Sequence, residues 1–478
     1  MTWADWSVIT IGLSWLIRLA MIPVVVTRKE NPTTCLAWLM IVFFEPWLGL
    51  ALYWLFGEDR LVRKRLRARL AAQASYEPIS SRPASVEPQT EQQPSQPFQL
   101  LASLGQTVGE MPVMNGNSLS FLIETEAVVE SLIRDIDAAQ HHVHLLFYIY
   151  ALDVVGERVT EAVIRAKQRG VECRVLIDDV GSWQAVRPLA VQFEQAGIEF
   201  GVSLPVSLLR RGLARIDMRN HRKLVVIDGS IAWTGSQNIV EDTYGHRGAG
   251  RWRDIMARIN GPAVREFQIL FLEDWHADTG AEVTGTQYFP DRPTSGNVAL
   301  QVIPSGPDRD PESLRHLIVE AIHTARREVT ITSPYFIPDE PLTCALTLAV
   351  RRGVQVNLIV PRRSDLRVVD FASSFYIGYL LKHGVRVFRF EDGLLHAKTL
   401  TVDDTFGMFG SANYDVRSFQ LNFELNVSLY DQHSLRELRW VQEHYRSQST
   451  EFSQTEWQNS PPWKHLAANL AKLFSPLL

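Results

Sequence analysis

The chain contains one short pattern twice. The first copy runs from His221 to Asn238 and the second from His396 to Asn413, 175 residues later, with identical spacing. The matched positions are His221 and His396, Lys223 and Lys398, Asp228 and Asp403, Ser236 and Ser411, and Asn238 and Asn413. One His-x-Lys sequence would mean little, but this match indicates a duplicated unit.

Each copy predicts a strand, a turn and a returning strand, because the residues between Lys and Asp are aliphatic or β-branched. Side chains alternate along a strand, so His221 and Lys223 share one face, as do His396 and Lys398. Asp228 and Asp403 have the opposite parity. They belong to the pattern and are candidate catalytic residues, yet we expect them mainly to end a strand and begin a turn.

Two copies that face each other would form a cationic cup rich in hydrogen-bond donors. Such a cup suits a phosphodiester, with one imidazole as nucleophile and the other as general acid and base. The alternative is two amphipathic strands whose His and Lys residues are incidental. Downstream carboxylates, Asp254 and Glu424, could bind the far nitrogen of each imidazole and set its tautomer, or could form surface ion pairs.

Further repeats surround the pattern. Residues 132–153 align with 317–340, and residues 162–179 align with 348–365, each as a helix followed by a strand. Alternating helices and strands predict an α/β fold, with two duplicated lobes that have mixed sheets and pack about a pseudo-twofold axis. We place the first lobe at residues 101–295 and the second at 296–478.

Two long apolar runs, residues 3–26 and 35–56, open the chain and bracket a short polar turn. Each is long enough to cross a bilayer, so residues 1–59 predict a transmembrane hairpin. A signal peptide is the alternative, but the start has no basic region. Arg18 and Glu45 lie within the runs at matching depth, and we expect them to pair, because an isolated charge in a bilayer is costly.

Residues 60–100 predict a basic segment and then a flexible tether. Six Lys or Arg residues lie between residues 60 and 69, which favours a cytoplasmic location for this segment and for the N-terminus. Residues 71–100 are rich in Pro, Ser, Gln and Glu, a composition typical of a tether.

Two amphipathic segments could contact a membrane. Residues 204–220 interleave apolar residues with Arg210, Arg211, Arg215 and Arg219, and predict either a lip that enters an anionic bilayer or an ordinary surface segment. Residues 463–478 predict either an interfacial helix or a helix that closes the core.

The charge distribution argues against a nucleic-acid partner. The chain has a net charge of −5, and residues 1–70 carry nine basic and five acidic residues, so the remainder carries −9. Three distant cysteines, Cys35, Cys173 and Cys344, suggest neither a disulfide framework nor a metal site.

The duplicated pattern resembles the signature of the phospholipase D superfamily. Within it, the N-terminal anchor and the segments FYIYALD, SPYFIP, LLHAKTLTVD, SANYDVRS and LNFE resemble bacterial cardiolipin synthases over nearly the whole chain. This resemblance implies that two phosphatidylglycerols give cardiolipin and glycerol, without a metal or nucleotide cofactor. It also implies His221 as nucleophile and His396 as acid and base, with Lys223, Lys398, Asn238 and Asn413 on the phosphate oxygens.

The apolar runs and the basic segment predict a multi-pass membrane protein with cytoplasmic catalytic lobes, and the resemblance implies the bacterial cytoplasmic membrane. Its partners would be phosphatidylglycerol and anionic membrane lipid, and a homo-oligomer stays open. The alternatives are a membrane-bound phospholipase D that hydrolyses its substrate, a membrane-tethered nuclease or phosphodiesterase of the same fold, and an inactive scaffold. Intact motifs disfavour the scaffold, and the acidic body disfavours the nuclease.

Overall fold

A computed structural model describes residues 3–29, 32–57, 60–80, 96–206, 217–245, 250–291, 294–310 and 312–477. The chain divides into two compact units. The first comprises Met1–Arg65 with Val206–Met218, and the second comprises Leu66–Pro205 with Arg219–Leu478. Each unit is described by itself below.

Among its described residues, the first unit contains one helix that is long and apolar enough to span a membrane. Helix α1 (Trp3–Arg28) is apolar over Trp6–Arg28, which is long enough to cross a bilayer. The prediction of a second long helix is wrong, and the hairpin is confirmed only in part: the second run forms helix α2 (Pro32–Phe44), helix α3 (Pro46–Leu52) and a π-helical turn (Tyr53–Gly57). Pro46 explains the break, because proline lacks an N–H and disfavours helical geometry in the residue before it.

The predicted ion pair between Arg18 and Glu45 is also wrong. Arg18 Nε donates a hydrogen bond to the Phe43 carbonyl at 2.9 Å, and the guanidinium lies 5.2 Å from the ring centre of Trp15. Arg18 does lie at the level of Glu45, because its hydrogen-bond acceptor, Phe43, is only two residues before Glu45 in the chain. The helix break at Pro46 leaves a backbone carbonyl there as an acceptor for Arg18.

Helical structure extends into the predicted tether from both ends. Helix α4 (Arg60–Ser80) covers the basic segment and the first part of the tether, and helix α5 (Gln96–Gly109) begins before the tether was expected to end. Residues 81–95 of the predicted tether lie outside the described residues. Leu101 of α5 packs in the core of the second lobe, although residue 101 was expected to open the first.

The two lobes repeat one order of elements. The first contains β1 (Val113–Leu122), α6 (Thr125–Ala138), β2 (His142–Phe147), α7 (Val154–Gln168), β3 (Glu172–Asp178), α8 (Val186–Ala196), β4 (Glu199–Ser203), β5 (Lys223–Ile227), β6 (Ile231–Gly235), β7 (Trp252–Arg253), β8 (Met256–Asn260) and α9 (Val264–Thr279), with a 3-10 turn at Thr286–Tyr288.

The second lobe contains β9 (Val298–Ser305), α10 (Ser313–Thr324), β10 (Glu328–Thr332), β11 (Phe336–Ile337), α11 (Glu340–Arg351), β12 (Gln355–Pro361), α12 (Arg367–Lys382), β13 (Arg386–Phe390), β14 (Leu394–Leu395), β15 (Thr399–Val402), β16 (Phe406–Gly410), β17 (Tyr414–Asp415), α13 (Val416–Gln420), β18 (Glu424–Leu429), α14 (Gln432–Ser447), β19 (Ser449–Phe452), α15 (Gln454–Gln458), α16 (Pro462–Ala471) and a 3-10 turn (Lys472–Leu477).

The strand order confirms the duplication. From its outer edge inward the first lobe has the order β4-β3-β2-β5-β6-β8-β1, and the second has β13-β12-β10-β15-β16-β18-β9, with β19 added outside β13. Strands β2 to β4 are parallel neighbours, as are β10, β12 and β13, whereas the strands on the inner side are antiparallel. Strands β1 and β9 pair antiparallel and join both halves into one 15-stranded sheet.

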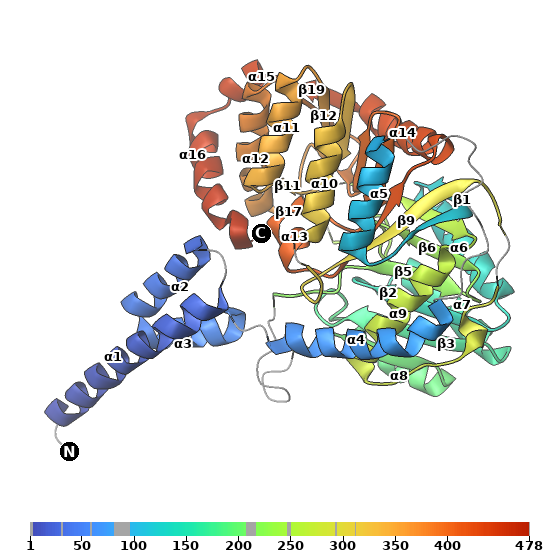
Figure 1. Ribbon diagram of the computed structural model, residues 1–478, viewed down its shortest axis with the longest axis horizontal. Coiled ribbons are helices and arrows are strands. Elements are labelled where there is room, and N and C mark those ends of the chain that lie inside the picture. The colour runs from blue at the N-terminus through green and yellow to red at the C-terminus, as the bar shows by residue number, and fades with distance from the viewer. Residues whose placement is uncertain are drawn as a thin grey trace. The chain divides into compact units, whose positions relative to one another are not determined.

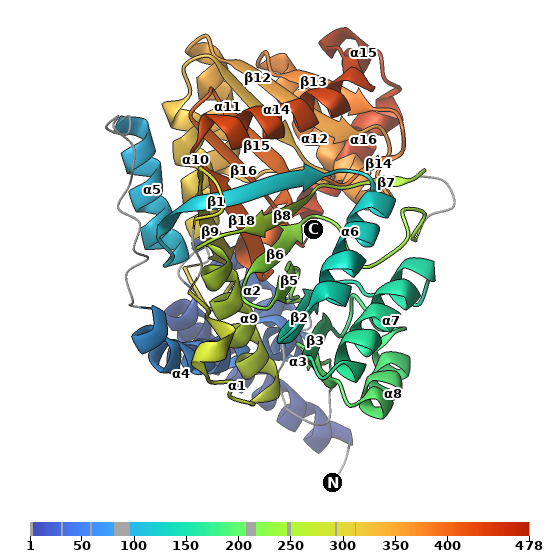
Figure 2. The ribbon, with the colours of Figure 1, turned by 90° about the vertical axis from the view of Figure 1, so that its right-hand side faces the viewer.

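Helices cover both faces of each half of the sheet (Figures 1 and 2). Residues of α6, α7 and α8 pack on one face of the first half, and residues of α10, α11 and α12 pack on one face of the second. On the inner faces, α9 of the first lobe and α14 of the second contribute to one shared core. This core holds the two lobes together and so positions the two copies of the pattern.

The C-terminal helix α16 packs on the second lobe with one side and exposes the other. Its Ala468 and Ala471 are buried, and Ala471 packs with residues of α12. The exposed side carries Trp463, Leu466 and Leu470, followed by Leu473 in the next turn. Small residues thus attach the helix to the second lobe, while its large apolar residues face outward.

Candidate active site

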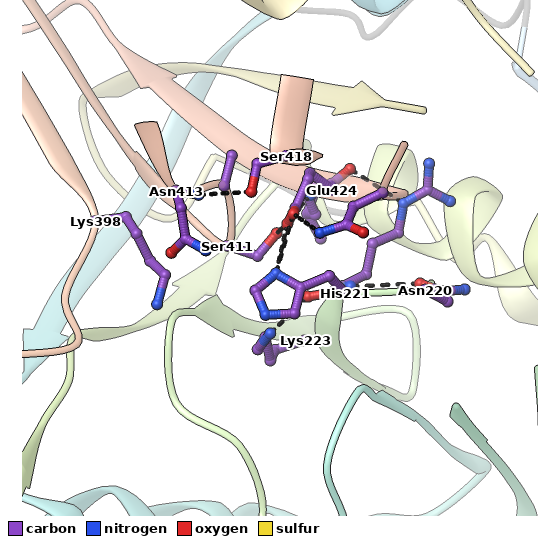
Figure 3. Close-up of polar contacts among 12 residues, drawn as sticks. Asn220, His221, Lys223, Lys398, Ser411, Asn413, Ser418 and Glu424 are labelled. Carbon is purple, nitrogen blue, oxygen red and sulfur yellow. Dashed lines mark hydrogen bonds and ion pairs between the residues drawn. The ribbon is translucent and has the colours of Figure 1, made fainter. Parts of the chain in front are cut away.

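His221 lies just before β5, at the end of the strand where the first copy of the pattern begins. Its Nδ1 lies 2.9 Å from Oε2 of Glu424, and its backbone N–H donates to the Phe423 carbonyl at 2.9 Å. Glu424 also accepts a hydrogen bond from the Ser411 hydroxyl at 2.5 Å (Figure 3). Glu424 and Ser411 both belong to the second lobe, so the first histidine is held by the other half of the molecule.

His396 has the reciprocal arrangement. Its Nδ1 lies 2.7 Å from Oδ1 of Asp254, and its backbone N–H donates to the Arg253 carbonyl at 2.7 Å. The Ser236 hydroxyl donates to Asp254 at 2.6 Å. The carboxylates predicted to orient the imidazoles therefore do so, but each acts on the histidine of the opposite lobe.

Both imidazoles use the same ring nitrogen, Nδ1, to bind a carboxylate. Because each Nδ1 is bonded to a carboxylate, each ring carries its proton there in the neutral form and leaves Nε2 with a free lone pair. An Nε2 lone pair can attack phosphorus or accept a proton from an alcohol. Among the described residues, neither Nε2 has a hydrogen-bond partner.

The two lysines are fixed by the same local contact. Lys223 Nζ donates to the His221 carbonyl, and Lys398 Nζ donates to the His396 carbonyl, both at 2.6 Å. Both side chains are buried, and burial lowers the pKa of Lys398 to about 8. Burial also lowers the pKa of Lys223, and Lys398 contributes by repulsion. Figure 3 shows the Lys223 amine beside His221 and the Lys398 amine farther from that ring. An anion bound between the two amines would offset their charge.

The imidazoles are neutral and the carboxylates ionised in the resting site. Burial lowers the pKa of His221 to about 4, with Lys223 acting in the same direction and Glu424 opposing. Burial and Lys398 likewise lower the pKa of His396. Burial alone would raise the pKa of Glu424, but His221, Lys223 and Ser411 together lower it to about 2.

The two asparagines of the pattern lie at the site in different ways. Asn238 Oδ1 accepts a hydrogen bond from the Ile149 N–H at 3.1 Å, which ties it to the chain after β2. The Asn413 N–H donates to the Ser418 hydroxyl at 3.2 Å, and its buried side-chain oxygen has no hydrogen-bond partner among the described residues. Each asparagine can offer its amide N–H groups to a phosphate oxygen.

The two aspartates of the pattern lie at the opposite end of their strands, and their contacts argue against a catalytic role. Asp228 accepts hydrogen bonds from the N–H groups of Gln140, His141 and His142 at 2.7–2.9 Å. Asp403 accepts from the N–H groups of residues 326–328, each at 2.8 Å. Both aspartates have positive φ, +52° and +49°, as expected for the first residue of a tight turn. They anchor the starts of β2 and β10.

Two aromatic residues at the site escaped the sequence analysis. The Tyr148 ring meets His221 at a centroid distance of 4.8 Å, and Trp252 meets His396 at 4.5 Å. Tyr148 lies in the segment FYIYALD, which carries part of the family resemblance and was a usable signal. Trp252 had no signal except its position two residues before Asp254.

The predicted basic lip is only partly described. Residues 207–216, which include Arg210, Arg211 and Arg215, lie outside the described residues. Arg219 is buried, and its guanidinium contacts Asp178 and the Leu204 carbonyl. The prediction that Arg219 belongs to a surface lip is therefore wrong, because its charge is used inside the first lobe.

Comparisons with known proteins agree with this geometry. The profile of the family described as "Cardiolipin synthase, PLD-like domain" matches residues 132–275 and 318–445, and that of "Phospholipase_D-nuclease N-terminal" matches residues 13–58. Cardiolipin synthase A of Serratia proteamaculans is 35% identical over 97% of each chain. Cardiolipin synthase A of Proteus mirabilis is 35% identical over 99% of this chain and 98% of its own.

A solved structure supports the fold. The crystal structure of phosphatidylserine synthase from Haemophilus influenzae aligns with a TM-score of 0.60 at 16% identity, and covers 79% of this chain and 99% of that one. At that identity the likeness concerns the fold alone. Together, the duplicated lobes and the near full-length relatives show that the chain belongs to the cardiolipin synthase family of the phospholipase D superfamily.

Proposed function

We propose that this protein is a cardiolipin synthase, which transfers a phosphatidyl group from one phosphatidylglycerol to another and releases glycerol. The observation that carries this proposal is the reciprocal pair of imidazoles. Each is bonded through Nδ1 to a carboxylate of the opposite lobe and leaves Nε2 free. Near full-length similarity to proteins named cardiolipin synthase A supports the choice of reaction.

In the first half-reaction, Nε2 of His221 attacks phosphorus, and the bond between phosphorus and the headgroup glycerol breaks. His396 takes up a proton at Nε2 when the anionic phosphodiester binds, and it gives this proton to the departing glycerol oxygen. In the second half-reaction, His396 takes a proton from the hydroxyl of a second phosphatidylglycerol, whose oxygen attacks phosphorus and breaks the P–N bond. Cardiolipin leaves, and both imidazoles return to their starting forms.

The remaining site residues stabilise the charge on the phosphate and keep the imidazoles oriented. Lys223 and Lys398 face the non-bridging oxygens and stabilise the charge that builds on them in each transition state. Asn238 and Asn413 add amide donors. Asp254 and Glu424 stabilise whichever imidazole becomes protonated, and Ser236 and Ser411 keep these carboxylates in place.

Transfer competes with hydrolysis, so the acceptor must reach the phosphatidyl-histidine before water does. A membrane location supplies a lipid alcohol at high local concentration, and α1 is apolar and long enough to provide it. We place the protein in the bacterial cytoplasmic membrane as a multi-pass protein with its lobes on the cytoplasmic side, following the basic segment after the apolar runs.

Helix α16 is a second membrane contact in this proposal. Its exposed Trp463, Leu466 and Leu470 form one apolar stripe, and Lys464 and Lys472 lie beside it. An apolar stripe with flanking lysines suits a bilayer that contains anionic phosphatidylglycerol.

The experiment that tests the function uses the purified full-length protein in vesicles of phosphatidylglycerol. Lipid products are separated and free glycerol is measured over time. A synthase produces cardiolipin, a hydrolase produces phosphatidic acid, and a nuclease leaves the lipid unchanged. Accumulation of phosphatidic acid without cardiolipin would replace the proposal with the hydrolase alternative.

A further inference from the structure

One break in the pseudo-twofold symmetry of the site lies two residues before each carboxylate. The N–H of His396 donates to the Arg253 carbonyl, and the N–H of His221 donates to the Phe423 carbonyl, so these two contacts are equivalent. The residue before Arg253 is Trp252, whereas the residue before Phe423 is Asn422. The duplicated frame therefore presents an indole on one side and a carboxamide on the other.

Trp252 contacts the imidazole of His396. The ring centroids lie 4.5 Å apart with an interplanar angle of 46°, and Trp252 is buried. An indole close to a cation stabilises it through the ring quadrupole, and tryptophan is the strongest of the aromatic residues in this respect. The contact thus favours the protonated form of His396 over its neutral form.

Among the described residues, His221 has no indole contact like that of His396. Its aromatic neighbour, Tyr148, meets it at an interplanar angle of 69°, and the Lys223 amine lies over the same Tyr148 ring at 5.3 Å from its centre. The Tyr148 ring is therefore shared with a second cationic group. It offers His221 less stabilisation as an imidazolium than Trp252 offers His396.

Asn422 acts on the carboxylate instead. Its amide N–H donates to Glu424 at 3.1 Å, so Glu424 accepts from three side chains: those of His221, Ser411 and Asn422. Asp254 accepts from two side chains among the described residues, those of His396 and Ser236. Hydrogen bonds to a carboxylate stabilise its charge and reduce its basicity. Asp254, which accepts fewer hydrogen bonds, therefore stabilises a protonated histidine more strongly than Glu424 does.

We propose that Trp252 and Asn422 are positioning residues that assign the proton to His396 and keep His221 as the nucleophile. This inference rests on the proposed function, in which one imidazole must be protonated when the other attacks. Both residues act in the same direction. Trp252 stabilises the imidazolium of His396, and Asn422 weakens the stabilisation that Glu424 could give to an imidazolium at His221.

The test locates the covalent intermediate. Full-length protein in detergent is mixed with short-chain phosphatidylglycerol, stopped in alkaline denaturant after a single turnover and digested. Mass spectrometry then compares phosphatidyl adducts on the peptides that contain His221 and His396. Glycerol release by the unaltered protein tests the proposed function separately, because it does not depend on which histidine carries the adduct.

The unaltered protein is expected to carry its adduct on His221. In the exchanged variant, Trp252→Asn with Asn422→Trp, a tenfold or greater rise in the fraction on His396 is expected, from about 1 kcal/mol of change at each position. Asn422→Leu and Trp252→Leu should each move the fraction in the same direction. Trp252→Phe keeps an aromatic ring and should restore the adduct to His221.

Circular dichroism and the melting temperature establish that each variant is folded. An adduct that stays wholly on His221 in folded exchanged and single-leucine variants would overturn the proposal. A folded exchanged variant that forms no adduct on either histidine would also overturn it, because the exchange should leave one competent assignment. Equal effects of Trp252→Phe and Trp252→Leu would exclude the aromatic contact as the cause.

Discussion

The imidazole of His221 and the carboxylate of Glu424 are hydrogen-bonded at 2.9 Å although 203 residues separate them in the chain. His396 and Asp254 form the reciprocal contact across 142 residues. Neither lobe therefore contains a complete catalytic pair. The site exists only when both lobes are folded and joined, which explains why the two halves share a core and a continuous sheet.

Replacement of either carboxylate should impair the histidine of the other lobe. We expect Glu424→Gln and Asp254→Asn each to lower kcat by about 10-fold or more, because the imidazole loses the carboxylate that fixes its tautomer and orientation. The matched control is Glu451→Gln. Glu451 is an exposed carboxylate on β19 that forms an ion pair with Arg386 of β13. Cardiolipin formation is the measurement, and activity within twofold of the control in either variant would contradict the assigned role.

Activity should fall at high pH because Lys398 loses its charge. Burial lowers its pKa to about 8, so the ammonium is present below that pH and is lost as the pH rises through it. Lys398→Arg keeps its charge at all relevant pH values, because the guanidinium pKa exceeds about 12. The falling limb of kcat should therefore move to higher pH in this variant. If kcat fell at the same pH in both proteins, the group that titrates would not be Lys398.

The protein should lose stability on acidification through its buried carboxylates. The folded-state pKa of Glu424 is about 2 and its ordinary value is 4.5, so its ionised form stabilises the fold at pH values above 4.5. This contribution is lost as the pH falls from 4.5 toward 2. The melting temperature of the unaltered protein should decrease more steeply over this range than that of Glu424→Gln. Parallel curves would show that Glu424 titrates normally.

Substitution of the pattern aspartates should affect stability more than chemistry. Asp228→Ala removes the acceptor of three backbone N–H groups, and we expect the free energy of unfolding to fall by about 2 kcal/mol or more. The folded fraction should keep kcat within about threefold, because the carboxylate lies at the far end of β5 from His221. Denaturant titration and initial rates separate the two effects. A large loss of kcat at unchanged stability would restore Asp228 as a catalytic residue.

The exposed stripe of α16 should matter only for substrate in a bilayer. Leu466→Gln with Leu470→Gln is expected to lower kcat/KM several-fold on vesicles, because two apolar side chains no longer enter the bilayer. Activity on monomeric short-chain phosphatidylglycerol should not change. Leu348→Gln is the control, because Leu348 is an exposed leucine on α11. Equal losses on both substrates would point to a structural role for the helix.

Much of this architecture was predictable because it depends on local patterns that occur twice. Strand periodicity around the two patterns identified β5, β6, β15 and β16, and parity placed Asp228 and Asp403 away from their histidines. The repeated helix and strand segments predicted duplicated α/β lobes. Each of these features follows from neighbouring residues and a fixed period.

The other features depend on partners that are distant in the chain. No local pattern indicates that Glu424 serves His221 and not His396, or that Leu101 packs with the second lobe. The amphipathic segment around Arg219 predicted a surface position. Arg219 is buried instead, because its guanidinium donates to the buried carboxylate of Asp178. Pro46 was a local signal for a helix break, but the long apolar run around it led to the prediction of one span.

The most direct test of the paired-histidine account follows phosphatidylglycerol labelled in its headgroup glycerol, with the full-length protein and with His221→Ala and His396→Ala. The account predicts one free labelled glycerol for each cardiolipin in the unaltered protein, and neither product in either variant. Cardiolipin formation by a folded His221→Ala or His396→Ala protein would contradict the account.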